Sequence, residues 1–212
     1  MTVAFLESIL VWAIPVLLAV ILHEVAHGVV AYALGDPTAK AAGRLTLNPL
    51  PHIDPMGTVV LPLFLLAVSS PFLFGYARPV PVNFARLGHP RRDMVLVAAA
   101  GPLTNLLLAA AFALLLRVLV EPGLALAQQG FWAQVALRGV LMNVVLAVFN
   151  MLPVPPLDGG RVLTGLLPPP LARAYAQVER FGMVIVILLL VSNVAGTVMH
   201  PISRAILRWL LG

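Results

Sequence analysis

The chain has 212 residues, of which 61% are hydrophobic and 10% are charged, and its mean hydropathy is +1.01. Soluble globular proteins average about 45–50% apolar and about 25% charged residues, and a soluble domain of this size could not bury so much apolar surface. The composition therefore excludes an ordinary soluble domain and predicts an all-α integral membrane protein, with residues 1–212 as a single domain. The net charge of +5 then indicates membrane topology and not nucleic-acid binding.

The first apolar segment, residues 5–34, is long enough to cross a bilayer, which takes about 20 residues. Its N-terminal end carries one acidic residue, Glu7, but no basic region and no small-residue cleavage site. We therefore expect no removable signal peptide before this span.

The same segment contains the sequence "ILHEVAHGVV" at residues 21–30. His23 and His27 are four residues apart and so share one face of a helix, where both imidazoles can bind one cation. Glu24 lies beside them and could take a proton from a water that the metal polarises, as in the H-E-x-x-H sequences of zinc hydrolases. Ionisable side chains inside a span are costly. The alternative is a polar face buried against other polar groups, for which the sequence nearby offers few partners.

Two unusual stretches follow the first span. The sequence "GRLTLNP" at 43–49 alternates apolar and polar residues and predicts a small β-hairpin-like element after the first helix. Residues 56–75 are apolar but interrupted by Gly57, Pro62, a Ser-Ser-Pro break at 69–71 and Gly75. We expect this stretch to enter the membrane as a re-entrant or partial segment.

Three further segments are long and apolar enough to span: residues 93–118, 131–152 and 181–199. With the first segment they predict four full transmembrane helices. Residues 200–212 begin at a break and predict a C-terminal amphipathic tail, in which Trp209 and two arginines suit the membrane interface.

A third metal ligand is expected because catalytic zinc takes three protein ligands and keeps one open position. The sequence "NMLPVPPLDGG" at 150–160 breaks a helix with its prolines and places Asp158 on unwound backbone, next to two glycines that permit tight turns. Such backbone is tolerated inside a membrane where it lines a wet cavity. By itself Asp-Gly-Gly is also an ordinary turn; beside the histidine pair, it predicts Asp158 as a ligand.

Together these motifs resemble the site-2 protease family of intramembrane zinc metalloproteases. The resemblance rests on the matching residues His23, Glu24, His27, Asn150, Pro153, Asp158 and Gly159. The element "AGPLTN" at 100–105 is similar to the family's central-helix element, and "GRLTLNP", "HIDPMG" and "GYARPVPVN" resemble a short bacterial or archaeal branch. Some members of the family carry PDZ or CBS domains, and no such sequence is present here.

The resemblance implies a zinc endopeptidase in which His23, His27 and Asp158 hold Zn²⁺ and Glu24 is the general base. Asn150 would contact the substrate backbone or the developing oxyanion; a hydrogen bond between helices is the alternative role. The substrate would be a transmembrane segment of another protein, and the other partner is the lipid bilayer. No nucleic-acid partner is expected, and the oligomeric state is left open.

Four further residues are candidates for substrate binding. Asn105 lies in a predicted transmembrane helix and could contact either a neighbouring helix or the substrate. Asn48 lies in the expected strand, which could pair with an unwound peptide or simply pack over the site. His52 and Asp54 could line a water path, cap the loop or tune the site.

The direction of the spans decides whether the ligands can meet. If residues 56–75 crossed the membrane, the first span and the 131–152 span would be antiparallel and Asp158 would emerge far from the histidines. A partial segment makes them parallel and puts most basic residues on one side, which the positive-inside rule assigns to the cytoplasm. We therefore expect a multi-pass protein of the cell membrane whose site opens toward the cytoplasm. A metal transporter or a non-catalytic scaffold of the same fold is the alternative function.

Overall fold

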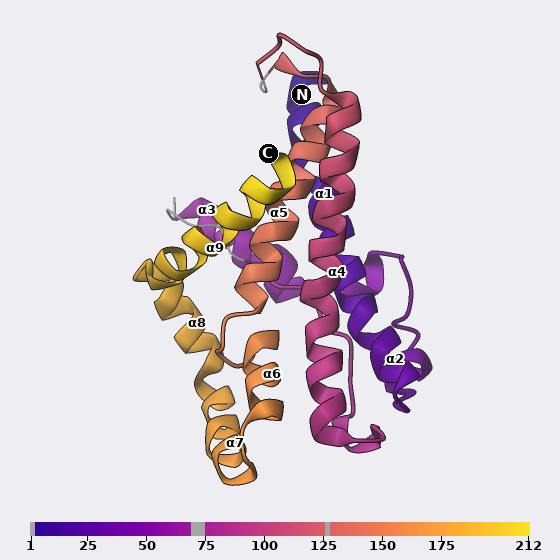
Figure 1. Cartoon of the computed structure of the whole chain (residues 1–212), viewed down its shortest axis with the longest axis vertical. Helices are drawn as coiled ribbons and strands as arrows, with labels where there is room; N and C mark the ends of the chain where they lie inside the picture. The colour runs from indigo at the N-terminus through magenta and orange to yellow at the C-terminus, as the bar shows by residue number, and fades with distance from the viewer. Residues whose placement is uncertain (1–2, 69–74, 126–127) are drawn as a thin grey trace.

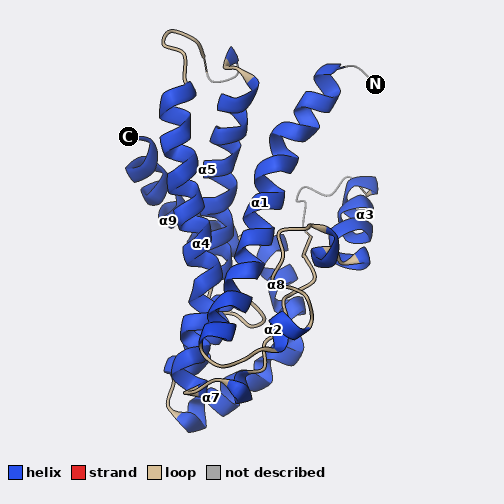
Figure 2. Ribbon diagram, turned by 90° about the vertical axis from the view of Figure 1, so that its right-hand side faces the viewer, coloured by secondary structure: helices blue, strands red, loops and turns tan. Residues whose placement is uncertain are grey.

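The computed structural model describes residues 3–68, 75–125 and 128–212, and its regular elements there are all helical (Figure 2). Within these ranges, four helical stretches are long and apolar enough to cross a membrane: Phe5–Ala33, Pro90–Leu119, Phe131–Asn150 and Pro169–Val191. The prediction of four such stretches in an all-helical protein is confirmed, but the fourth lies at Pro169–Val191 and not at the predicted 181–199.

Three long helices form the centre of the molecule: α1 (Val3–Ala33), α4 (Pro90–Leu119) and α5 (Phe131–Asn150). All three pack against one another, and α1 and α5 run in the same direction while α4 runs in the opposite one (Figure 1). The carbonyl of Leu34 accepts a hydrogen bond of 3.1 Å from the Gly88 N–H. The chain therefore leaves α1 and enters α4 at the same end of the bundle.

Small side chains fill the contact between α4 and α5. Ala109 and Ala113 of α4 form one buried cluster with Val140 and Val144 of α5, and small residues at such contacts let two helix backbones approach closely in a membrane. Several large side chains on α4 face outward instead, as Leu107 does at 64% exposure. Small side chains inside and large apolar side chains outside suit a protein whose surroundings are apolar.

The long connection between α1 and α4 contains only short helical pieces among its described residues: α2 (Thr38–Ala41), η1 (Leu50–His52), the π-helical η2 (Pro55–Val60), α3 (Leu61–Ala67) and η3 (Phe84–Arg86). The predicted β-hairpin-like element is wrong. Residues 43–49 form turns, in which Thr46 Oγ1 accepts from the Asn48 N–H and Asn48 Oδ1 accepts from the Leu50 N–H. These side chains satisfy the backbone locally and so compete with strand pairing.

The apolar stretch at 56–75 begins as a helix, and its two ends lie close together. The run Pro55–Ala67 measures about 20 Å at the rise of a helix, against about 30 Å of hydrocarbon. The N–H of Tyr76 donates to the carbonyl of Gly57 at 3.0 Å, so both flanks of the stretch lie together. The predicted break at 69–71 lies outside the described residues.

The C-terminal part contains α6 (Asp158–Leu166), α7 (Pro169–Ala176), η5 (Gln177–Phe181), α8 (Gly182–Val191) and α9 (Val194–Leu211). The predicted boundary at residue 200 is wrong. The chain turns at Asn193, whose φ of 59° is left-handed and ends α8, whereas α9 continues through Pro201. The end of α9 packs on the bundle, because Leu210 joins the α4–α5 cluster and its carbonyl accepts from Arg117.

Candidate metal centre

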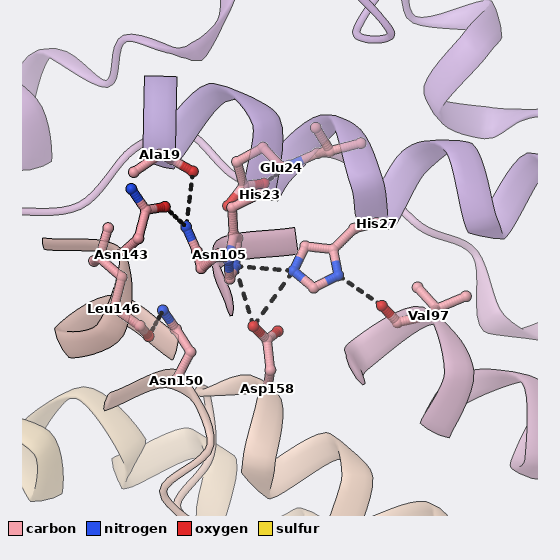
Figure 3. A network of polar contacts seen from close by, with 11 residues as sticks. Ala19, His23, Glu24, His27, Val97, Asn105, Asn143, Leu146, Asn150 and Asp158 are labelled. Atoms are coloured by element: carbon pink, nitrogen blue, oxygen red, sulfur yellow. Dashed lines mark hydrogen bonds and ion pairs between the residues drawn. The ribbon is translucent and has the colours of Figure 1, made fainter. Parts of the chain in front are cut away.

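Two imidazoles and one carboxylate meet between α1 and the start of α6. His23 Nε2 and His27 Nε2 are 3.0 Å apart, and Asp158 Oδ2 lies 3.1 Å from the first and 3.3 Å from the second (Figure 3). All three side chains are buried, with residue exposures of 7%, 7% and 5%. Among the described residues, they form the one group of three His, Cys, Asp or Glu side chains that could hold a metal ion.

The other ring nitrogen of each histidine is bound to an acceptor. His27 Nδ1 lies 2.7 Å from the carbonyl of Val97, which can only accept, so Nδ1 carries the proton. His23 Nδ1 lies 2.6 Å from Asn105 Oδ1. The Asn105 amide is oriented by its Nδ2, which donates to the Ala19 carbonyl and to Asn143 Oδ1. Both histidines are thus held in the tautomer whose Nε2 has a free lone pair.

Two lone pairs and a carboxylate oxygen consequently point at one another. Asp158 Oδ2 is buried and has no hydrogen-bond donor, which is costly unless a cation compensates it. A tetrahedral zinc with bonds of about 2.0–2.1 Å separates its ligand atoms by about 3.3 Å, close to the three distances here. The donor set therefore fits a divalent ion such as zinc.

Asp158 is the first residue of α6 and not part of unwound backbone, which corrects the prediction. Its position in the first turn of a helix favours the ionised carboxylate. The glycines after it also act differently from the prediction, because both lie inside α6. A side chain at Gly159 would collide with the Met151 carbonyl, and one at Gly160 would lie 2.5 Å from the nitrogen of Pro155. These glycines let α6 pack directly against the proline-rich turn.

Gly101 of α4 makes room for the two imidazoles. A Cβ at this position would lie 2.5 Å from His23 Cε1 and 2.5 Å from His27 Nε2. The sequence indicated this glycine only as part of the "AGPLTN" element. Its role depends on a contact between two helices, which the sequence does not reveal.

Glu24 and Asn150 line a cavity of about 190 Å³ next to His23, together with Tyr76 and Ala77. Glu24 Oε2 accepts a hydrogen bond of 2.7 Å from the Val80 N–H. Asn150 Nδ2 donates to the carbonyl of Leu146 at 3.0 Å. The cavity is large enough for several water molecules, so the two predicted catalytic residues and His23 line one space that water can enter.

The predicted substrate-binding residues lie elsewhere and make structural contacts. Asn105 is fully buried and contacts His23, Asn48 accepts from Leu50 N–H, and His52 Nε2 lies 3.0 Å from the Thr46 carbonyl. Asp54 caps η2 by accepting from the N–H groups of Met56 and Gly57. None of the four lines the cavity, and their contact with substrate stays a prediction.

Two further residues contribute to the site and were not predicted from the sequence. Asn143 extends the amide chain from Asn105 to the Gly139 carbonyl; a polar residue inside a span was the available signal. Arg44 is buried and donates from Nη2 to the Arg78 carbonyl at 2.6 Å, which ties down the segment that reaches Glu24 at Val80.

Comparison with known proteins agrees with this geometry. The profile of Peptidase family M50 matches residues 118–192, which include Asn150 and Asp158. The chain is 40% identical over 201 residues to "Putative zinc metalloprotease YwhC" of Bacillus subtilis (strain 168), covering 91% of this chain and 85% of that protein. The chain belongs to peptidase family M50, the site-2 protease family.

Two further relatives match over shorter shares of their length. "Putative zinc metalloprotease Rip2" of Mycolicibacterium smegmatis (strain ATCC 700084 / mc(2)155) is 34% identical over 176 residues, which cover 83% of this chain and 64% of that protein. "Putative zinc metalloprotease MJ0611" of Methanocaldococcus jannaschii is 45% identical over 67 residues, covering 32% of this chain and 31% of that protein. No solved structure matches the chain.

Proposed function

We propose that this protein is an intramembrane zinc endopeptidase that cleaves transmembrane segments of other membrane proteins. The observation that carries the proposal is the convergence of His23 Nε2, His27 Nε2 and Asp158 Oδ2 beside Glu24, on a helix long and apolar enough to span a bilayer. The names of its relatives as zinc metalloproteases support the same metal and the same class of reaction.

Zinc would be held by His23, His27 and Asp158, and when bound it polarises the scissile carbonyl and makes water acidic enough to attack near neutral pH. Glu24 is the general base: it takes the proton of the attacking water and later delivers a proton to the leaving nitrogen. One of its oxygens is fixed by the Val80 N–H, and the other has no hydrogen-bond partner among the described residues. That second oxygen is available for the proton.

Asn150 is proposed to stabilise charge that develops on the substrate carbonyl. Its Nδ2 has two hydrogens, and the Leu146 carbonyl takes one of them. The second can donate to an oxyanion in the cavity, where a fixed donor counts for more than it does in water. A helical substrate hides its carbonyls, so it must unwind before it enters this space.

The proposed setting is the cell membrane, with the site opening to the cytoplasm. Support comes from the parallel course of α1 and α5 (Figure 1) and from the hydrogen bond between Leu34 and Gly88, which keeps these two residues at the same end of the bundle. In this proposal the stretch 56–75 enters the membrane partially and returns. The basic residues of 34–92 and 161–180 then face the cytoplasm.

The test is cleavage of a single-span substrate in proteoliposomes by the purified protein. Wild-type protein should cut within the span, and Glu24→Gln should lose the cleavage while it keeps its zinc, because Glu24 is not a ligand. Intact protein that never cleaves but carries zinc into the vesicles would contradict the proposal in favour of transport. If the Glu24→Gln protein still cleaves the substrate, Glu24 is not the general base.

A further inference from the structure

A second, larger cavity lies at the end of the molecule away from α6 and α7, where α1 begins and α5 starts (Figure 1). Its volume is about 430 Å³, and its polar lining includes Glu7, Ser8, Gln129, Gln134 and Arg138. We call it the N-terminal cavity. None of these residues takes part in the metal centre, so the proposed proteolysis gives them no role.

The N-terminal cavity contains opposite charges that do not pair with each other. Among the described residues, ion pairs join only Asp158 to the two histidines, so Glu7 and Arg138 face the cavity without forming one. Arg138 Nε is buried and has no hydrogen-bond partner. An arginine inside a helix that can span a membrane is costly. Because Arg138 lines the cavity, a ligand with an acceptor for the terminal nitrogens of its guanidinium would offset that cost.

Hydrogen bonds and a cation–π contact hold the residues that line the N-terminal cavity in place. Gln129 is buried, and its side chain bonds to the backbone of Glu121 and Leu124. Gln134 donates to the Gln129 carbonyl at 3.0 Å. The guanidinium carbon of Arg138 lies 4.6 Å from the centre of the Trp12 ring, which holds the guanidinium by a cation–π contact.

The two charges lie at different depths. Arg138 is level with Trp12, and Glu7 precedes Trp12 by five residues in the same helix, which is about 7.5 Å toward the N-terminal end. The positive group is therefore the deeper one and the negative group the outer one. A phospholipid headgroup with an ammonium has the matching order, since its phosphate lies next to the acyl chains and its ammonium lies toward water.

We propose that the N-terminal cavity binds the phosphoethanolamine headgroup of a membrane lipid, with the phosphate on Arg138 and the primary ammonium on Glu7. The chemistry selects this class: an anionic headgroup without an amine leaves Glu7 unpaired, and a trimethylated amine has no N–H to donate to it. Basic residues between membrane helices can bind lipid headgroups through the phosphate.

The test compares lipids retained by the purified full-length protein. Protein in nanodiscs with equal amounts of phosphatidylethanolamine, phosphatidylcholine and phosphatidylglycerol is extracted in mild detergent, and native mass spectrometry counts the bound lipids. Wild-type protein should keep phosphatidylethanolamine about tenfold over the other two, as expected for one charge-assisted hydrogen bond. Equal retention of the three lipids overturns the proposal, and this arm needs no variant.

Variants then test the two residues. Arg138→Gln and Glu7→Gln should each lower the retained phosphatidylethanolamine about tenfold, with zinc content unchanged as a sign of intact folding. Arg173→Gln and Glu179→Gln, which change exposed charges outside the cavity, are the controls and should leave the retained phosphatidylethanolamine unchanged. Wild-type retention in both cavity variants overturns the proposal. Excess soluble glycerophosphoethanolamine should leave the lipid bound. Complete displacement of the lipid would mean that the cavity binds the free headgroup and not a membrane lipid, which overturns the proposal. Retention is measured without cleavage, so it stands apart from the proposed function.

Discussion

At the scale of single residues, the metal centre depends on side chains that never touch the metal. Asn105 fixes the tautomer of His23, and its own amide is oriented by Ala19 and Asn143. Partners of this kind typically change metal affinity by about 10–100-fold. The chemistry of the site therefore extends from α1 through α4 into α5.

Asn105→Ala should weaken zinc binding by about 10–100-fold, because the His23 ring loses the acceptor that orients it. Competition with a zinc chelator of known affinity measures the effect on purified protein. Asn150→Ala is the matched control: the same change at a residue outside the chain of amides should leave zinc affinity near wild type and lower cleavage. Equal zinc affinity in Asn105→Ala and wild type would contradict the role given to Asn105.

Gly101→Ala should lower zinc content to a small fraction of wild type, because the new methyl group takes space that the imidazoles occupy. Metal analysis of the purified variant gives the result. Gly130→Ala is the control, since a Cβ there meets nothing within 4 Å, and it should keep its zinc. A Gly101→Ala protein with a full zinc complement would show that α4 does not crowd the site.

The grouping of His23, His27 and Asp158 in the structure could be expected from the sequence, because the two histidines follow a helical spacing and Asp158 follows a helix break. The role of Glu24 as the base stays a prediction. The supporting roles of Asn105 and Gly101 could not be expected from the sequence. They arise where α4 approaches α1, and a single sequence carries no information on which face of α4 does so.

At the scale of elements, the connection between α1 and α4 is fixed by one carboxylate. Asp36 follows α1, is fully buried, and accepts from the Thr38 N–H at 3.0 Å, from the Thr38 hydroxyl and from the Asn83 N–H at 2.6 Å. It joins the start of the connection to the residues just before α4. The segment between them includes Val80, whose N–H holds Glu24.

Asp36→Asn should lower the free energy of unfolding by about 1.5–3 kcal/mol, the usual value for a hydrogen bond to a charged group. Burial disfavours the charge, but hydrogen bonds from Thr38 and Asn83 outweigh it and hold the pKa of Asp36 below its usual range. The charged form thus stabilises the fold above the unfolded-state pKa of about 3.9 and is lost as the pH falls through the lower folded value.

Unfolding in detergent at pH 6 and at successively lower pH measures this difference. The gap between wild type and Asp36→Asn should be full at pH 6 and should shrink as the pH falls below about 4. Glu179→Gln, at an exposed carboxylate, should show no gap at either end. A gap that is the same throughout would contradict the account of Asp36.

The elements were predicted unevenly, and the physical reasons differ. The long spans follow from apolar length alone. The expected strand at 43–49 failed because Thr46 and Asn48 bond to nearby backbone, and the expected break at residue 200 failed because Asn193 ends α8 first. Local side-chain bonds and left-handed residues decide such boundaries, and hydropathy does not report them.

At the scale of the whole molecule, the arrangement requires residues 34–89 to begin and end on one side of the membrane. The chain has no cysteine, so single cysteines can be introduced without a background. Lys40→Cys and Arg92→Cys, both at exposed positions, should react with a membrane-impermeant maleimide only from the cytoplasm. Gln128→Cys should react only from outside. Labelling of Lys40→Cys and Arg92→Cys from opposite sides would mean that residues 56–75 cross the bilayer.

The proposed metal centre needs one zinc ion held jointly by α1 and α6, and the zinc content per chain of purified ligand variants measures whether it is. Wild-type protein and Glu24→Gln should each carry one zinc ion per chain. His23→Ala, His27→Ala and Asp158→Ala should each carry almost none, because two ligands do not replace three. A full zinc complement in Asp158→Ala would contradict the account.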